Sequence, residues 1–375
     1  MPVEKETLNN PIPTIEVVYA GGTISSFATT EGYREGGHVV DLVGEISQRV
    51  PYFEERFSIG HKEVAFTGLS ENVEPKDWDV IEEKVIEALE RDPRGVIVTF
   101  GTDGMEQLAR RLDNEKVREI LTRKKAKLIL LGANDDISLP ETDAWDNLEF
   151  GFESIESDVL AGVYVAFHRK LIPAEKVVKK PFDYENDVAM TYIANDHPEY
   201  TLALQKQKER DDRIIAEMEA AFDKEQGTED ILEYAVNIVR TNHDEFLEYI
   251  ASHDVRAVLL TLYHSGTANT ENPSMSVSEL VNRLRHEKGI TFFAATENGE
   301  PVSLHAYETS IKLREAGVVP LYDMPRTVAL AKLKLIDGQV EGSQLIHEML
   351  SDKVGEIDES RVIKADIDNL VGLYT

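Results

Sequence analysis

The chain has 375 residues and a formal net charge of −30 at neutral pH, from 70 acidic and 40 basic side chains. A chain this acidic is a poor partner for nucleic acid or an anionic membrane, and the absence of cysteine excludes disulfides, thiolate nucleophiles and cysteine-ligated metals. No apolar run approaches the roughly 18 residues of a membrane helix, and the first residues lack a signal-peptide core, so the sequence predicts a cytoplasmic protein.

Apolar runs of strand length alternate with helical patterns in the first half of the chain. The expected strands are Ile15–Tyr19, Glu63–Thr67, Gly95–Phe100, Lys127–Gly132 and Gly162–Phe167. Amphipathic helices are expected between them, at Trp78–Arg91 and Met105–Arg123. This alternation predicts a mainly parallel, doubly wound α/β domain with helices on both faces of its sheet, which we place at residues 12–196.

A strongly charged segment, His197–Phe222, precedes a second α/β pattern. Its composition is that of an exposed helix, so residues 197–228 are expected to form an acidic helical linker or insertion. A smaller C-terminal α/β domain is expected over residues 229–375, with Glu359–Thr375 as a tail. Its expected strands are Ile231–Val239, Ala257–Leu262, Gly289–Ala294 and Val318–Tyr322, and its expected helices are Glu245–Ser252, Val277–His286 and Glu308–Ala316.

Two threonines each follow a hydrophobic strand and a glycine turn. Thr23 comes after Gly21-Gly22, and Thr102 comes after Gly101 and before Asp103. Ligands bind at the carboxyl ends of the strands in an open α/β sheet, so two hydroxyls placed there point to nucleophilic chemistry. Backbone N–H groups beside both threonines, and the helix that begins after Asp103, would stabilise an oxyanion.

Each motif also has a purely structural interpretation. Thr102 or Asp103 could simply cap a helix, and Gly21-Gly22-Thr23 could be an ordinary tight turn or part of a dinucleotide loop. The full G-x-G-x-x-G pattern is absent, which argues against the dinucleotide loop. The scattered histidines lack ligand spacing, so no metal site is predicted. The two motifs in tandem favour a hydroxyl nucleophile.

In these segments the chain resembles the bacterial-type L-asparaginase family. The segments that carry the resemblance are Ala20–Ser25, Gly101–Glu106, the substrate-holding loop Ser70–Trp78 and the strand end Leu131-Gly132-Ala133. The resemblance extends from Thr14 to about Ile357 and implies an asparaginase-like fold.

The resemblance implies hydrolysis of the side-chain amide of L-asparagine to aspartate and ammonia, through a threonine nucleophile and an acyl-enzyme, without a cofactor. The implied catalytic residues are Thr23, Tyr33, Thr102, Asp103 and Lys179. Thr23 would be the nucleophile, with Tyr33 on a flap as its hydroxyl partner, and the other three would form a second centre. Lys180 is the alternative to Lys179 if the alignment slips by one residue. Whether the lysine is a base or polarises Thr102 stays open, as does which threonine is acylated.

The implied substrate-binding residues are Gly22, Ser70, Glu71, Gly101, Asp103 and Ala133. Ser70 would hold the α-carboxylate and Asp103 the α-ammonium group, which positions a zwitterion. Glu71 departs from the uncharged residue of many relatives; facing the pocket, it would add negative charge and disfavour the aspartate product.

A residue from the smaller domain of a neighbouring subunit is also implied. The candidates are Glu308 and Asn269, although the pattern favours an exposed carboxylate at a helix start for Glu308. His264, in the same turn as Asn269, could be an ordinary hydrogen-bonded loop histidine. The resemblance therefore predicts a homodimer or homotetramer, with a small amino-acid amide as substrate and neither nucleic acid nor membrane as partner.

Three alternatives stay open. A glutaminase or a hydrolase of another amide would use the same chemistry, because one methylene changes discrimination by only about 1–3 kcal/mol. A tRNA-linked amidotransferase component shares the motifs, but the chain starts almost at its first strand, and its charge argues against RNA. A non-catalytic amino-acid sensor would keep the same pocket.

Overall fold

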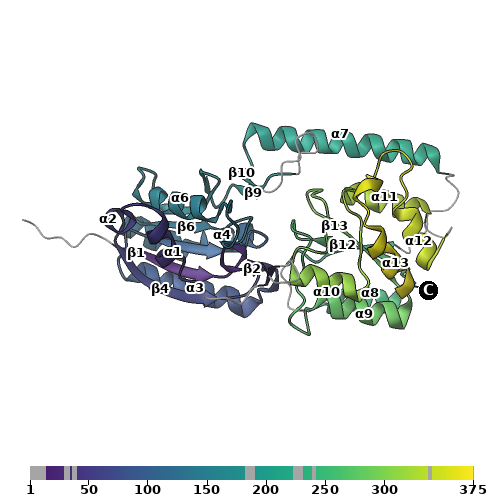
Figure 1. Ribbon diagram of the computed structural model, residues 1–375, viewed down its shortest axis with the longest axis horizontal. Coiled ribbons are helices and arrows are strands. Elements are labelled where there is room, and N and C mark those ends of the chain that lie inside the picture. Colours follow the sequence, from purple (N-terminus) through teal and green to yellow (C-terminus); the bar gives the residue numbers. More distant parts are fainter. Residues whose placement is uncertain are drawn as a thin grey trace, which may run out of the picture.

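The structure is a computed structural model that describes residues 14–28, 34–35, 40–181, 191–222, 231–238, 242–336 and 340–374. Tyr33, and with it part of the expected flap, lies outside these residues. The two larger sheets, each with helices on both faces, form the cores of a larger N-terminal and a smaller C-terminal α/β domain (Figure 1). The predicted fold class is confirmed.

The N-terminal domain holds a sheet of six strands in the order β4-β1-β5-β6-β7-β8, in which only β8 runs antiparallel to its neighbour. Its strands are β1 (Ile15–Ala20), β2 (Phe27–Ala28), β3 (Arg34–Glu35), β4 (Ile59–Phe66), β5 (Gly95–Phe100), β6 (Lys127–Leu131), β7 (Gly162–Phe167), β8 (Lys170–Pro173), β9 (Val177–Lys179) and β10 (Tyr192–Ala194). Its helices are α1 (Leu42–Arg49), α2 (Phe53–Arg56), α3 (Pro75–Glu90), α4 (Met105–Leu112), α5 (Glu115–Lys124) and α6 (Ala144–Glu156), with 3-10 turns η1 (Thr23–Ser25) and η2 (Ser70–Asn72).

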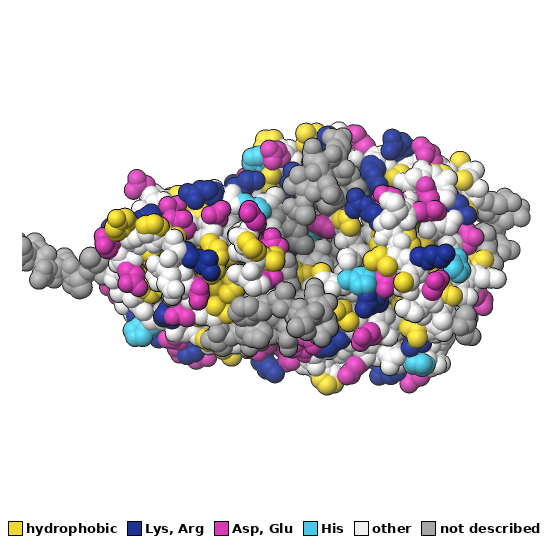
Figure 2. Space-filling model, in the orientation of Figure 1, with side chains coloured by type: hydrophobic (Ala, Val, Ile, Leu, Met, Phe, Trp, Pro, Cys, Tyr) yellow, Lys and Arg dark blue, Asp and Glu magenta, His cyan; other side chains and the backbone are white. Residues whose placement is uncertain are grey.

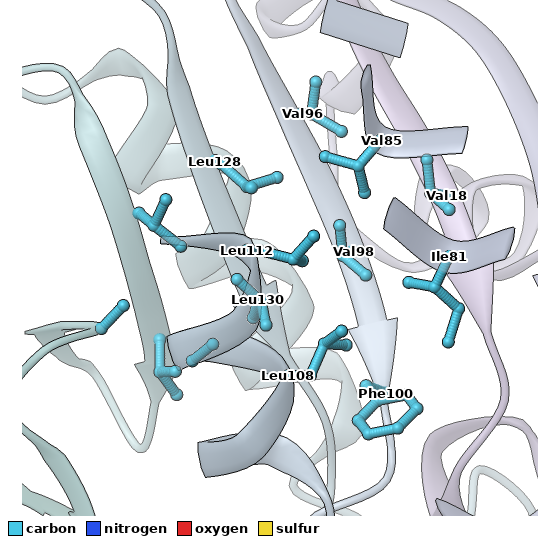
Figure 3. Packing of buried hydrophobic residues seen from close by; sticks show 14 of the residues in the cluster. Val18, Ile81, Val85, Val96, Val98, Phe100, Leu108, Leu112, Leu128 and Leu130 are labelled. Atoms are coloured by element: carbon cyan, nitrogen blue, oxygen red, sulfur yellow. The ribbon is translucent and has the colours of Figure 1, made fainter. Parts of the chain in front are cut away.

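Strands β1, β5 and β6 are buried along their whole length, as expected for the centre of a sheet covered on both sides. On one face, Val18 and Val98 pack against Ile81 of α3 and Leu108 of α4 (Figure 3). On the other face, Ile97 belongs to a second cluster with α1, α2 and α6. These two layers fix the carboxyl ends of β1 and β5 side by side.

The helix expected over Met105–Arg123 is broken in two. Helix α4 ends at Leu112, and α5 begins at Glu115. The side chain of Asn114 caps α5 by accepting a hydrogen bond from the Val117 N–H at 3.0 Å. An asparagine competes well as a cap, so the polar pair Asp113-Asn114 ends one helix and starts another.

The C-terminal domain holds a parallel sheet in the order β11-β12-β13-β14. Its strands are β11 (Ile231–Ala235), β12 (Ala257–Leu262), β13 (Thr291–Thr296) and β14 (Val319–Pro320). Its helices are α7 (Pro198–Ala221), α8 (Asp244–Ser252), α9 (Val277–Lys288), α10 (Glu308–Ala316), α11 (Arg326–Ile336), α12 (Gly342–Met349) and α13 (Lys364–Leu373), with a 3-10 turn η3 (Glu359–Arg361). Helices α8, α9 and α10 cover one face, and α7, α11, α12 and α13 cover the other.

The charged helix α7 is only partly exposed. It begins after His197, whose ring accepts a hydrogen bond from the Glu199 N–H. Ile214 and Met218 are buried in the core of the C-terminal domain, and the helix lies beside α11 (Figure 1). The segment predicted to be a solvated linker or insertion therefore contributes a layer to the second domain.

The last residues do not form a tail, and that expectation is wrong. They fold into η3 and α13, and α13 buries Ile367 and Leu370. Arg285 Nη1 donates a hydrogen bond to the Leu373 carbonyl at 3.0 Å, which fixes the helix end against α9. Two buried residues in ten are too few to show as periodicity in a sequence, so only the tertiary packing reveals this helix.

Acidic and basic side chains are interspersed over the visible face of both domains (Figure 2). Many of them form ion pairs at the surface, such as Arg56 with Glu149 and Arg111 with Glu82. Among the described residues, no helix is both long enough and apolar enough to cross a membrane.

Candidate active site

Thr23 and Thr102 follow neighbouring strands. Strand β1 pairs in parallel with β5, with Ala20 opposite Phe100. The two threonines therefore lie at adjacent carboxyl ends of the central sheet, and each is only 5% exposed. The structure brings together the two hydroxyl-bearing loops that the sequence singled out.

Glycines allow three loops to touch at this point. Gly22 has a φ of +87°, and a Cβ placed on it would lie 2.2 Å from the Gly101 nitrogen. A Cβ on Gly101 would lie 2.3 Å from Ser70 Oγ. The Ser70 hydroxyl also accepts a hydrogen bond from the Gly104 N–H at 3.3 Å. Because only glycine fits both positions, the Thr23, Thr102 and Ser70 loops form one compact group.

A buried ion pair lies beside Thr102. Lys179 Nζ is 2.9 Å from Asp103 Oδ1, and both side chains are at least 96% buried. Lys179 ends β9, which pairs with β10 so that Lys179 faces Tyr192. The Tyr192 hydroxyl donates a hydrogen bond to the Thr102 carbonyl at 2.5 Å. The β9–β10 pair thus holds the lysine against the carboxyl end of β5.

The geometry favours the charged form of Asp103. Burial alone would raise its pKa, but the Lys179 charge, a hydrogen bond from Thr267 and the nearby His264 together hold the pKa below its ordinary value. An ionised carboxylate only accepts hydrogen bonds, which matches the donors that surround it. Asp103 is therefore suited to bind a cationic group such as an ammonium.

Side chains of the C-terminal domain complete this group within the same chain. Ser265 Oγ donates to Asp103 Oδ1 at 3.1 Å, and Thr267 Oγ1 donates to Asp103 Oδ2 at 2.6 Å. His264 Nδ1 lies 3.2 Å from the buried carboxylate of Glu300. The sequence pointed to the turn that holds His264, but it gave no signal for Ser265, Thr267 or Glu300 individually, because these contacts join residues far apart along the chain.

Glu71 lies in η2 beside Ser70 and is buried. Burial, and then the negative charge of Asp103, raise the pKa of Glu71 to about 8. At neutral pH most of this carboxyl group is protonated, so the negative charge expected from the sequence is largely absent. A cavity of about 20 Å³, enough for one water molecule, is lined in part by Glu71, Tyr263 and Asn269.

The remaining candidate residues differ in burial and in their contacts. Ala133 is buried just after β6. Asn269 of this same chain lines the cavity next to Glu71. Glu308 begins α10 and forms a partly exposed ion pair with Lys312 at 2.7 Å. Among the described residues, no group of three or more acidic or histidine side chains is arranged to hold a metal ion.

Part of the chain matches a known protein family, and most of its length is similar to known proteins. Residues 14–186 match the family described as the N-terminal domain of asparaginase. The chain is 24% identical over 365 residues to a glutamyl-tRNA(Gln) amidotransferase subunit of Methanococcus maripaludis, and the match covers 94% of this chain and 82% of that protein. It is 26% identical over 358 residues to the corresponding protein of Pyrococcus horikoshii, with 92% and 77% covered.

Two solved structures are more distant. The L-asparaginase of Thermococcus kodakarensis is 19% identical with a TM-score of 0.38, covering 92% of this chain and 99% of that one. The probable cytoplasmic L-asparaginase of Campylobacter jejuni is 16% identical with a TM-score of 0.40, covering 91% and 100%. The segment that carries the two threonine loops therefore matches the N-terminal domain of the asparaginase family.

Proposed function

We propose that this protein hydrolyses the side-chain amide of L-asparagine to aspartate and ammonia. The observation that carries the proposal is the buried Asp103–Lys179 pair beside Thr102. Thr23 lies at the carboxyl end of the neighbouring strand. Two hydroxyls, a lysine and a carboxylate in one buried group provide a nucleophile, a group to activate it and a site for an ammonium.

The proposed reaction has two stages. A threonine hydroxyl, Thr23 in our assignment, attacks the amide carbon and loses its proton as the C–O bond forms. Backbone N–H groups of the glycine loops stabilise the tetrahedral oxyanion, and ammonia leaves with the proton that it needs. Water then attacks the acyl-enzyme, which releases aspartate and restores the hydroxyl. Lys179 and Asp103 would polarise Thr102 in this scheme, with Tyr33 as the hydroxyl partner of Thr23.

Substrate binding follows from the charges around the site. The Asp103 carboxylate would take the α-ammonium group, and the Ser70 hydroxyl would take the α-carboxylate. Because Glu71 is mostly protonated at neutral pH, its neutral carboxyl group would donate a hydrogen bond to the substrate or accept one from it. This clamp selects amino acids over simple amides.

The test is ammonia release by the purified protein with L-asparagine, L-glutamine and D-asparagine in parallel. Release from L-asparagine with the highest kcat/KM supports the proposal. Faster release from L-glutamine or D-asparagine would keep the chemistry and change the substrate. If no amide is hydrolysed, calorimetry measures the binding of asparagine. Tight binding without ammonia release would instead support an amino-acid sensor.

The sequence relatives favour a second candidate, a component of a glutamyl-tRNA(Gln) amidotransferase. The net charge of −30 argues against direct contact with RNA. The two roles differ in whether ammonia release requires other molecules. Full turnover by the protein alone supports the hydrolase, whereas release that appears only on addition of glutamyl-tRNA(Gln) and a partner protein supports the amidotransferase.

A further inference from the structure

Two hydroxyls from the C-terminal domain reach the carboxylate that would bind the substrate amino group. Ser265 Oγ lies 3.1 Å from Asp103 Oδ1, and Thr267 Oγ1 lies 2.6 Å from Asp103 Oδ2. Thr267 is fully buried. With Lys179 on Oδ1, each carboxylate oxygen has at least one donor, and the donors come from both domains.

The loop that carries these hydroxyls is built to present them. The Tyr263 N–H donates to the Thr267 carbonyl at 3.0 Å, and the Gly266 N–H donates back to the Tyr263 carbonyl at 2.9 Å. Gly266 has a φ of +71°, which allows this tight reversal at the end of β12. Ser310 of α10 donates to the Gly266 carbonyl at 3.0 Å, so the loop is fastened to the rest of its domain.

We propose that Thr267 and Ser265 are positioning residues of this active site, which hold the Asp103 carboxylate in the orientation that binds the substrate α-ammonium group. The inference rests on the proposed function and extends it to the second domain. A carboxylate offers about four acceptor positions, so three fixed donors orient it and leave room for one more at Oδ2. Thr267 acts through Asp103 and does not itself touch the reacting atoms.

The energetic reason is that hydrogen bonds to a charged group are stronger than neutral ones, and more so in a dry site. Loss of the Thr267 donor would leave Oδ2 without this partner and let the carboxylate rotate. Catalysis is sensitive to such changes, since a misplacement of about 1 Å can reduce a rate by about a hundredfold. A threonine that served only to pack the two domains together would not need its hydroxyl.

The experiment compares Thr267→Val with Thr267→Ser. Valine keeps the shape but removes the donor, whereas serine keeps the donor. We expect Thr267→Val to lower kcat/KM for the amide substrate by about tenfold to a hundredfold, mainly through KM. Thr267→Ser should stay close to wild type. Ser265→Ala should have a smaller effect of the same kind, because its hydrogen bond is longer and less buried.

Thr261→Val is the matched control. Thr261 is a buried threonine of β12 whose hydroxyl donates to Glu233 at 3.2 Å and not to Asp103. It should change stability without changing KM. If Thr267→Val keeps the wild-type KM, or if Thr267→Ser is impaired as strongly as Thr267→Val, the proposal is wrong and the methyl packing is what matters.

The pH profile gives a readout that packing alone would not move. Loss of the Thr267 donor removes a contact that favours ionised Asp103, so the acidic limb of kcat/KM should move to higher pH in Thr267→Val and not in Thr261→Val. Neither variant changes the other ionisable groups around Asp103. These groups are Lys179, His264, Glu71, Tyr192 and Tyr263. An unmoved limb in Thr267→Val contradicts the positioning role.

A second measurement separates failure of this inference from failure of the proposed function. If the wild type releases ammonia from no amide, the function is wrong, and the contact is tested by urea unfolding instead. Thr267→Val should lower the urea midpoint in the wild-type background and much less in an Asp103→Asn background. Equal shifts in the two backgrounds would show that Thr267 does not act on Asp103.

Discussion

The Thr309 hydroxyl of the C-terminal domain donates a hydrogen bond to the Glu71 carboxyl group of the N-terminal domain at 2.7 Å. Both side chains are buried. Glu71 is therefore a buried acid at a domain interface, and the negative charge of Asp103 raises its pKa more than that of Glu271 does. Its protonation state links the stability of the interface to pH.

Glu71→Gln tests this link. The pKa of Glu71 rises from 4.5 to about 8 on folding, so its contribution to stability is full below pH 4.5 and is lost as the pH rises towards 8. Glutamine does not titrate, so the variant should not lose this contribution to stability as the pH rises. We expect the free energy of unfolding of Glu71→Gln, relative to wild type, to increase between pH 5 and pH 8 and then level off. Urea unfolding at several pH values measures it, and a difference that does not vary with pH would contradict the buried-acid account.

Gly101→Ala tests the contact among the three loops. The new Cβ would lie 2.3 Å from Ser70 Oγ and 3.2 Å from Gly22 Cα, so the loops must separate. We expect a loss of about 1–3 kcal/mol in the free energy of unfolding and at least a hundredfold loss of ammonia release. Gly372→Ala is the control, because its Cβ would meet nothing within 4 Å. Retention of activity by Gly101→Ala would show that the loops need not touch.

Lys179→Met tests the buried ion pair and the register of the lysine. Removing the cation leaves the buried Asp103 charge without its ion-pair partner, at a cost of about 3–5 kcal/mol, and should abolish ammonia release. The adjacent Lys180→Met is the matched control and should stay active. A reversed result, with Lys180→Met inactive and Lys179→Met active, would move the catalytic lysine by one residue.

A chemical cross-link tests whether one chain closes its own site. In this structure the Asn272 side chain lies near the Glu74 carboxylate across the domain interface, and the Thr270 N–H donates to Asn72 Oδ1 at 3.1 Å. Because the chain has no cysteine, Glu74→Cys combined with Asn272→Cys offers a short bis-maleimide a single pair of thiols. We expect a cross-linked band at the mass of one 42.2-kDa chain.

The control for the cross-link is a mixture of the two single-cysteine variants. It should give no band at twice the mass of the chain. Such a band would show that the C-terminal domain of a neighbouring subunit covers the site, as the family resemblance had suggested for Asn269 and Glu308.

The elements that could be predicted are those whose pattern is local. Strands β5, β7 and β12 begin and end at the predicted residues, because each is an apolar run bounded by a turn. Helix α10 also matches its predicted bounds. Helix α13 was missed, since only Ile367 and Leu370 are buried and nothing in the local pattern marks them.

The candidate site divides in the same way. Thr23 and Thr102 stand out because a glycine turn follows a strand in both cases, which is a local signal. Lys179 came from the family resemblance, and the structure places it on Asp103. Thr267 contacts Asp103 across 164 positions of sequence, so only the folded chain shows that contact.

The most direct measurement of the central claim is ammonia release by Thr23→Val, Thr102→Val and Thr99→Val with the best amide substrate. In each case valine replaces the hydroxyl with a methyl group and leaves the rest of the side chain unchanged. Thr99 is the matched control, since it lies on β5 and its buried hydroxyl has no hydrogen-bond partner among the described residues. The account predicts at least a thousandfold loss of kcat in the first two variants and near wild-type activity in the third. Retention of ammonia release by both Thr23→Val and Thr102→Val would contradict it.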